Sequence, residues 1–116
     1  MHALIKTKKE PGAEFKEVKV PEIRADEVLV KVEAAAICGS DLHIYNWNKF
    51  ASDRVNPPLI FGHEFFGEVV AKGDQVNAVS IGDKIAAETH LPCSTCFQCR
   101  TGSSHICPSW ELPVRH

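Results

Sequence analysis

The sequence predicts a small, mainly β domain, an antiparallel barrel or sandwich, with a loop lobe held together by a metal ion. Short runs of alternating polarity, separated by turn residues, indicate several half-buried strands. A stretch near the end, LPCSTCFQCRTGSSHICP, carries four of the five cysteines and has no regular pattern. With 116 residues, 44% of them hydrophobic and 24% charged, the chain has the size and composition of one globular domain.

The first third of the chain predicts strands. Residues 14–20 (EFKEVKV) alternate in polarity, and DEVLVKVEA places Val28, Val30 and Val32 on one half-buried face. Pro11-Gly12 and Pro21 mark the ends of these runs. The pattern indicates two strands before residue 35.

The middle of the chain predicts a helical turn, a loop and two more strands. Residues 40–47 (SDLHIYNW) suit a helical turn capped by Ser40 or Asp41. Residues 48–58, which include Pro57-Pro58, predict an exposed loop. FFGEVVAKGDQV and IGDKIAAET predict strands joined by Gly-Asp turns. Everything from Leu91 onward is expected to be loop, so helix should be scarce.

Charge and hydropathy exclude several classes of protein. The net charge is −2 with both signs mixed along the chain, which gives no electrostatic case for binding nucleic acid or an anionic membrane. No apolar run approaches the roughly 18 residues that a membrane span needs, and the N-terminus does not resemble a signal peptide. We therefore expect a cytoplasmic protein with reduced thiols, and the odd number of cysteines argues against a disulfide framework.

The cysteine loop has the spacing C-x2-C-x2-C-x7-C, formed by Cys93, Cys96, Cys99 and Cys107. Thiolates two residues apart converge on one ion, and four complete a closed tetrahedral zinc site that contributes folding energy to a segment without an apolar core. An iron–sulfur cluster is the competing interpretation, because Cys107 is followed by proline as in bacterial ferredoxins. In either case the closed site leaves no coordination position for a substrate.

A second, dispersed group of residues predicts an open metal site. Cys38, His63 and Glu64 lie beside glycines, and a thiolate, an imidazole and a carboxylate hold zinc with room for a further ligand. Such an ion is a Lewis acid that lowers the pKa of a bound hydroxyl. Ser40 and His43 follow Cys38 and are placed to carry the released proton outward. The competing interpretation is a free buried Cys38, a hydrogen-bonded His63 and a solvated Glu64; Asp41 is expected to be a surface or hydrogen-bonding carboxylate.

These motifs together resemble the N-terminal catalytic domain of the zinc-containing medium-chain alcohol dehydrogenases. The family signature G-H-E-x2-G-x5-G-x2-V is matched by six residues: Gly62, His63, Glu64, Gly67, Gly73 and Val76. The C-G-S-D-x-H segment around Cys38 and the four-cysteine lobe also match, in the family's order. HIYNW (43–47) and ETH (88–90) are similar to the branch that oxidises L-threonine, whereas Ser40 replaces the threonine usual there and is found in polyol dehydrogenases.

The resemblance implies a fold, a reaction and roles for residues. The fold would be a GroES-like β-barrel, and the reaction would be oxidation of a small alcohol, threonine or alternatively a sorbitol-like polyol, by hydride transfer to NAD in a homo-oligomeric parent enzyme. Ser40 and His43 would relay the proton. A catalytic zinc would be held by Cys38 and His63, with Glu64 a ligand or close partner. A structural zinc would be held by Cys93, Cys96, Cys99 and Cys107.

The chain contains no G-x-G-x-x-G from which a dinucleotide-binding turn can be made. We therefore expect residues 1–116 to be an incomplete catalytic domain, with residues 91–108 as the structural zinc lobe and no NAD-binding Rossmann domain. Hydride transfer needs a bound cofactor, so the isolated chain is expected to be inactive. A non-enzymatic zinc-binding module is the alternative from a different functional class.

Overall fold

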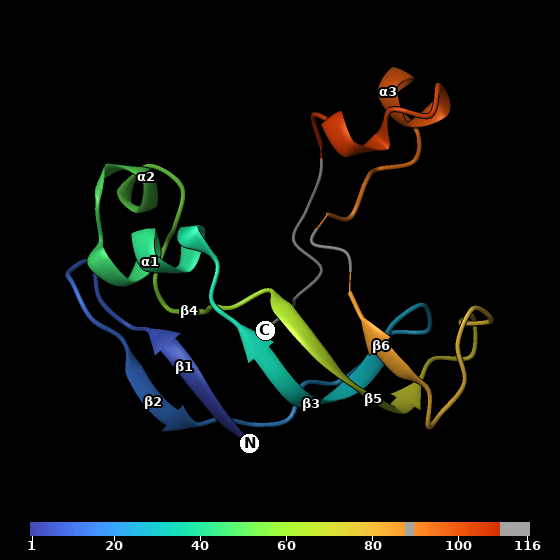
Figure 1. Cartoon of the computed structure of the whole chain (residues 1–116), viewed down its shortest axis with the longest axis horizontal. Coiled ribbons are helices and arrows are strands. Elements are labelled where there is room, and N and C mark those ends of the chain that lie inside the picture. Colours follow the sequence, from blue (N-terminus) through green and yellow to red (C-terminus); the bar gives the residue numbers. More distant parts are fainter. Residues whose placement is uncertain (88–89, 110–116) are drawn as a thin grey trace.

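The computed structural model describes residues 1–87 and 90–109, and it confirms the predicted mainly β fold (Figure 1). The strands are β1 (His2–Lys6), β2 (Glu14–Glu17), β3 (Val28–Ala36), β4 (Leu59–Ile60), β5 (Glu64–Lys72) and β6 (Lys84–Ala86). The helical elements are α1 (Gly39–Asn46), α2 (Lys49–Ser52), α3 (Phe97–Arg100) and a 3-10 turn, η1 (Ser104–Ile106). Each of these helices is too short to cross a membrane.

The first sheet has three antiparallel strands in the order β2-β1-β4. Its central strand, β1, pairs Leu4 with Phe15 on one side and Ile5 with Ile60 on the other. Ala3 and Ile5 are buried in the core. The sequence did not predict β1 or β4, because five and two residues are too few to show a period.

The second sheet has the order β3-β5-β6, again antiparallel, and it contains the two longest strands, each of nine residues. Val69 on β5 is fully buried. Gly67 permits the close approach of the strands, since a Cβ there would collide with the backbone carbonyl of Lys31. Register shifts in the β3–β5 pairing break the period of two, and Val32 is 55% exposed rather than sharing the half-buried face of Val28 and Val30.

The two sheets lie side by side beneath the helices, and within residues 1–87 and 90–109 they do not close into a barrel (Figure 1). The strand from residue 14 is also shorter than predicted, ending at Glu17 rather than at residue 20.

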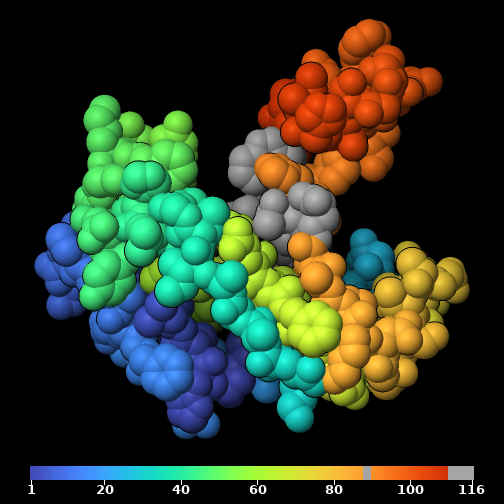
Figure 2. Space-filling view, in the orientation of Figure 1, coloured from blue at the N-terminus to red at the C-terminus, as the bar shows by residue number. Residues whose placement is uncertain are grey.

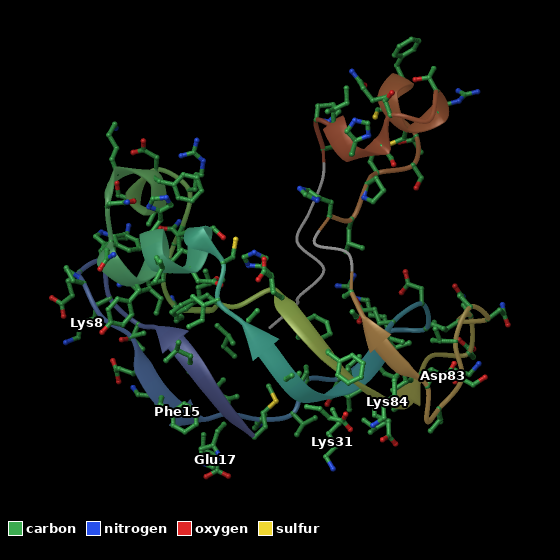
Figure 3. All side chains as sticks on the ribbon, viewed as in Figure 1. Lys8, Phe15, Glu17, Lys31, Asp83 and Lys84 are labelled. Atoms are coloured by element: carbon green, nitrogen blue, oxygen red, sulfur yellow. The ribbon has the colours of Figure 1, made fainter. Side chains whose placement is uncertain are left out.

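Across the second sheet, Lys84 donates to Glu68 at 2.9 Å and to Glu33, so one cation bridges all three strands. Figure 3 shows Lys84 and Lys31 along this sheet and Phe15 on β2.

Three local predictions were wrong. Helix α1 is capped by Cys38 rather than by Ser40 or Asp41. Helix α2 lies within the segment predicted to be loop, because the Asn48 side chain accepts from the Ala51 N–H (3.3 Å) and provides an N-cap. The cysteine lobe contains α3 and η1 where only loop was expected. The lobe projects away from both sheets (Figures 1 and 2).

Lys6 is fully buried at the end of β1 and holds the C-terminal end of α1. Its Nζ donates to the backbone carbonyls of Gly12 (2.7 Å), Tyr45 (3.1 Å) and Glu10, and it lies 5.2 Å from the centroid of the Trp47 ring. Burial lowers the pKa of this ammonium from its ordinary value. Because the carbonyl of Tyr45 belongs to the last turn of α1, the cation also lies at the negative end of the helix dipole.

We predict that Lys6→Met lowers the free energy of unfolding by about 2–4 kcal/mol. Methionine fills the space of the lysine stem but cannot donate, so the variant loses the charged hydrogen bonds to Gly12, Tyr45 and Glu10, and a hydrogen bond from a charged donor contributes roughly 1.5–3 kcal/mol. Urea denaturation would measure the change. Lys8→Met is the matched control, because the Lys8 side chain is 70% exposed, and it should leave the midpoint unchanged. Equal stability of the Lys6 and Lys8 variants would contradict the role given to Lys6.

Candidate metal centres

Cys38 is positioned by the beginning of α1. It is the N-cap of the helix, with extended backbone angles (φ −80°, ψ 158°), and it lies two residues after the end of β3. The carboxylate of Asp41, three residues on, accepts a hydrogen bond from the Cys38 N–H at 2.9 Å. This is half of a capping box, and it fixes the direction in which the Cys38 side chain leaves the backbone.

His63 comes later in the sequence than Cys38 but belongs to the same candidate metal site. It precedes β5 and follows Gly62, whose φ of +112° produces a turn that other residues rarely adopt. Its Nδ1 lies 3.5 Å from Asp41 Oδ1, and its Nε2 lies 3.5 Å from Ser40 Oγ. Asp41 was predicted to be a surface or a hydrogen-bonding carboxylate. The hydrogen-bonding alternative is confirmed by its contact with the Cys38 N–H, and the surface alternative is wrong, because Asp41 is only 5% exposed.

Cys38, His63 and Glu64 offer one ligand atom each, and these atoms lie within 4.8 Å of one another. All three side chains are partly buried. With Nδ1 of His63 directed at Asp41, Nε2 is the nitrogen left for a metal. Asp41 Oδ1 is buried and has no hydrogen-bond partner among residues 1–87 and 90–109. An Nδ1–H on a metal-bound His63 would supply that partner, so the arrangement fits a metal ion and leaves room for a further ligand.

Ser40 and His43 do not form a direct pair. Ser40 lies beside His63, whereas the hydrogen-bond partner of His43 among the described residues is Asn48, with Asn48 Nδ2 2.6 Å from His43 Nδ1. The His43 ring also packs against Phe50, with centroids 5.1 Å apart. A relay from Ser40 to His43 would therefore need an intermediate group between them.

The four cysteines of the lobe also converge. Their ligand atoms lie within 4.8 Å of one another. Individual sulfur–sulfur distances are 3.4 Å for Cys96–Cys99 and 3.9 Å for both Cys93–Cys99 and Cys96–Cys107. Four sulfurs at the usual 2.3 Å from a tetrahedral zinc ion would be about 3.8 Å apart. The lobe is thus folded near the geometry of a closed four-thiolate site, with Cys107 buried at its centre.

The local environment separates the acidities of two of these thiols. Hydrogen bonds from the Thr95 backbone and side chain, and then from the Cys96 N–H, lower the pKa of Cys93 to about 6. Desolvation raises the pKa of Cys99 to about 12, with further contributions from the neighbouring sulfurs. At neutral pH the metal-free lobe therefore carries a thiolate at Cys93 and a thiol at Cys99, and metal binding must displace the proton of Cys99.

The contacts of Asp41 with His63 and of Asn48 with His43 were not predicted. The C-x2-D spacing at the start of a helix is a signal for Asp41, since a carboxylate at that position reaches back to the N-cap N–H. Asn48 could not be recognised, because its contact with His43 depends on how α2 packs against α1.

The fold, the two cysteine-containing centres and the comparison with protein families all indicate the same family. The model of the alcohol dehydrogenase GroES-like domain matches residues 24–114. The chain belongs to this family of alcohol dehydrogenase domains.

Two curated relatives carry the same name. The chain is 54% identical over 107 residues to an L-threonine 3-dehydrogenase of Bacillus licheniformis, covering 92% of this chain and 31% of that protein. It is 47% identical over 112 residues to an L-threonine 3-dehydrogenase of Pyrococcus furiosus; this match covers 97% of this chain and 32% of that protein. The chain therefore spans about a third of the length of these curated relatives.

Solved structures give the same fold. An alcohol dehydrogenase from Thermus sp. ATN1 superposes with a TM-score of 0.80 at 33% identity, covering 97% of this chain and 31% of that one. Galactitol-1-phosphate dehydrogenase from Escherichia coli superposes with a TM-score of 0.85 at 31% identity, with the same coverage. The fold is therefore that of the corresponding part of these dehydrogenases.

We predict that Asp41→Asn weakens zinc binding at Cys38, His63 and Glu64 by about 10–100-fold, the usual effect of losing a carboxylate behind a histidine ligand. Competition with a chelator would measure the zinc affinity. The measurement is made in a Cys107→Ser background, which should remove the lobe's ion so that only the zinc at Cys38, His63 and Glu64 is titrated. Asp74→Asn, on an exposed turn, is the control. An unchanged affinity in Asp41→Asn would show that Asp41 does not support His63.

We also predict that iodoacetamide alkylates Cys93 before Cys99 in the metal-free chain at neutral pH. Because its pKa is lowered, Cys93 is a thiolate above about pH 6, and its alkylation rate should level off above that pH. Peptide mapping by mass spectrometry would follow each site, and saturating zinc should protect both. Equal rates at the two cysteines would be inconsistent with the separation of their acidities.

Proposed function

We propose that this chain is the metal-binding part of the catalytic domain of a zinc- and NAD-dependent L-threonine 3-dehydrogenase. The observation that carries the proposal is the convergence of Cys38, His63 and Glu64 beside the hydroxyl of Ser40. The names of the two curated relatives described above favour threonine as the substrate. The reaction would oxidise the 3-hydroxyl of threonine and give 2-amino-3-oxobutanoate.

Each residue of the open site has a defined task in this proposal. A zinc ion held by Cys38 and His63, with Glu64 as a ligand or close partner, would supply Lewis acidity that favours ionisation of the substrate hydroxyl. Asp41 keeps His63 oriented through Nδ1. Ser40, beside His63, accepts the substrate proton, and His43 passes it toward solvent after an intermediate group has carried it from Ser40.

The lobe has a structural task. Cys93, Cys96, Cys99 and Cys107 would hold a second zinc ion with every coordination position filled, so this ion stabilises the lobe and takes no part in the reaction. None of the five cysteines, all of which lie within the described residues, forms a disulfide. This supports a reducing compartment, and we propose the cytoplasm. A homo-oligomer is our proposal for the complete enzyme.

NAD is assigned to a part of the complete enzyme outside these 116 residues, because they contain no G-x-G-x-x-G. Residues 1–116 are proposed to be an incomplete catalytic domain, with residues 91–108 as its structural lobe. The isolated chain should then bind metal without reducing NAD.

A polyol dehydrogenase is the second candidate function. Ser40, which lies 3.5 Å from His63 Nε2, is the residue that polyol dehydrogenases are expected to carry at this position. A solved neighbour named galactitol-1-phosphate dehydrogenase also shares the fold. Both candidates use the same metal site and relay, and they differ only in the alcohol that is oxidised.

We predict that residues 1–107 of this chain, replacing the matching segment of the Bacillus licheniformis enzyme, give a chimera that reduces NAD with L-threonine. Its kcat/KM for threonine should exceed that for sorbitol by at least tenfold. Ser40→Ala should lower kcat by about 100-fold or more, because it removes a proton-transfer group, and Ser40→Thr should retain activity.

A higher kcat/KM with sorbitol would favour the polyol dehydrogenase. A folded chimera that binds two zinc ions and oxidises neither alcohol would support the non-enzymatic module. NAD reduction by the isolated chain at the rate of the chimera would contradict the placement of the cofactor outside these residues.

A further inference from the structure

Helix α2 makes two contacts with the ring of His43. Asn48, the N-cap of the helix, lies 2.6 Å from His43 Nδ1 through its Nδ2, and Phe50 packs against the ring at 5.1 Å between centroids. The backbone of Asn48 also donates to the His43 carbonyl at 3.4 Å. The ring is therefore held by a four-residue helix that the sequence pattern did not predict.

The orientation of the Asn48 amide is set by its other contact. Asn48 Oδ1 accepts from the N–H of Ala51 at 3.3 Å, and Ala51 is 0% exposed. A buried backbone N–H can only donate and needs an acceptor. The amide oxygen must therefore face Ala51, and the NH2 group must face His43.

That orientation determines which nitrogen of His43 carries the proton. The Asn48 NH2 group can only donate, so the His43 Nδ1 that it faces must be the acceptor. In the neutral ring the proton then lies on Nε2. The burial of Ala51 thus fixes the tautomer of a histidine eight residues earlier in the chain.

We propose that Asn48 is a positioning residue that holds His43 in the Nε2–H tautomer. The consequence for the relay rests on the proposed function, whereas the tautomer itself does not. An imidazole moves a proton by gaining one at one nitrogen and losing one from the other. Nε2 already carries its proton, so an incoming proton must bind at Nδ1. The Asn48 contact opens as it arrives, and the Nε2 proton leaves to water.

Two substitutions at position 48 separate the role of Asn48 as an N-cap from its control of the His43 tautomer. Asn48→Asp keeps an N-cap oxygen for Ala51 but has no N–H, so its carboxylate requires an Nδ1–H donor on His43. Asn48→Ser also keeps the cap, but its side chain is too short to reach the ring. If Asn48 served only as the N-cap, wild type, Asn48→Asp and Asn48→Ser would all show the same His43 tautomer.

The test is nitrogen NMR of the uniformly 15N-labelled, zinc-loaded chain at about pH 9, where imidazoles are neutral. His43→Gln assigns the signals. We expect wild type to show a protonated Nε2, an unprotonated Nδ1 and a scalar coupling between Asn48 Nδ2 and His43 Nδ1. In Asn48→Asp the major tautomer should invert to Nδ1–H, and in Asn48→Ser neither tautomer should be held and the coupling should be lost.

A wild-type ring with its proton on Nδ1 would overturn the proposal, as would an Asn48→Asp variant that keeps the Nε2–H tautomer. If Asn48→Asp does not fold, the coupling in wild type and its loss in Asn48→Ser decide the question. Because no substrate or NAD is present, an inactive chimera would count against the proposed function without affecting this result.

Discussion

The carboxylate of Asp41 joins the two parts of the chain from which the open site is built. One oxygen accepts from the Cys38 N–H at 2.9 Å, and the other lies 3.5 Å from His63 Nδ1. The antiparallel pairing of β3 with β5, which sets Ala36 opposite Glu64, brings Cys38 and His63 together although they are far apart in sequence. The Asp41 contacts then orient these two side chains relative to each other. Lys6 holds the opposite end of α1 through the Tyr45 carbonyl. Helix α1 is thus fixed at both ends, and the geometry of the site depends on that.

The two candidate metal centres are built in different ways. The site of Cys38, His63 and Glu64 depends on two strands and a helix that also pack against the rest of the domain. The cysteine lobe has almost no apolar core, since Phe97 and Ile106 are 77% and 60% exposed, and its four sulfurs form its centre. A metal ion would therefore contribute a larger share of the folding free energy in the lobe than in the rest of the domain.

The sequence could predict features that depend on local pattern. Alternation located β2 and β3, the Gly-Asp turns located β5 and β6, and the cysteine spacing located the lobe, because all of these signals are carried by neighbouring residues. It could not predict β4, which has two residues, or the burial of Asp41, which results from its contact with His63. Helix α2 was missed for a similar reason: its N-cap Asn48 matters because Ala51 is buried, and burial is set by packing. The sequence predicted the metal ligands by residue type, but it did not predict the contacts that orient them, such as that of Asp41 with His63.

The central claim is that the chain carries one four-thiolate site and one separate site of mixed ligands. X-ray absorption spectroscopy at the zinc edge tests it most directly, in wild type loaded with zinc at both sites and in a Cys107→Ser variant from which a chelator has removed any zinc bound by the lobe. We expect one sulfur at about 2.3 Å and nitrogen or oxygen ligands at about 2.0–2.1 Å. Wild type should show a majority of sulfur. A sulfur-only shell in both proteins, or no retained zinc in the variant, would contradict the claim.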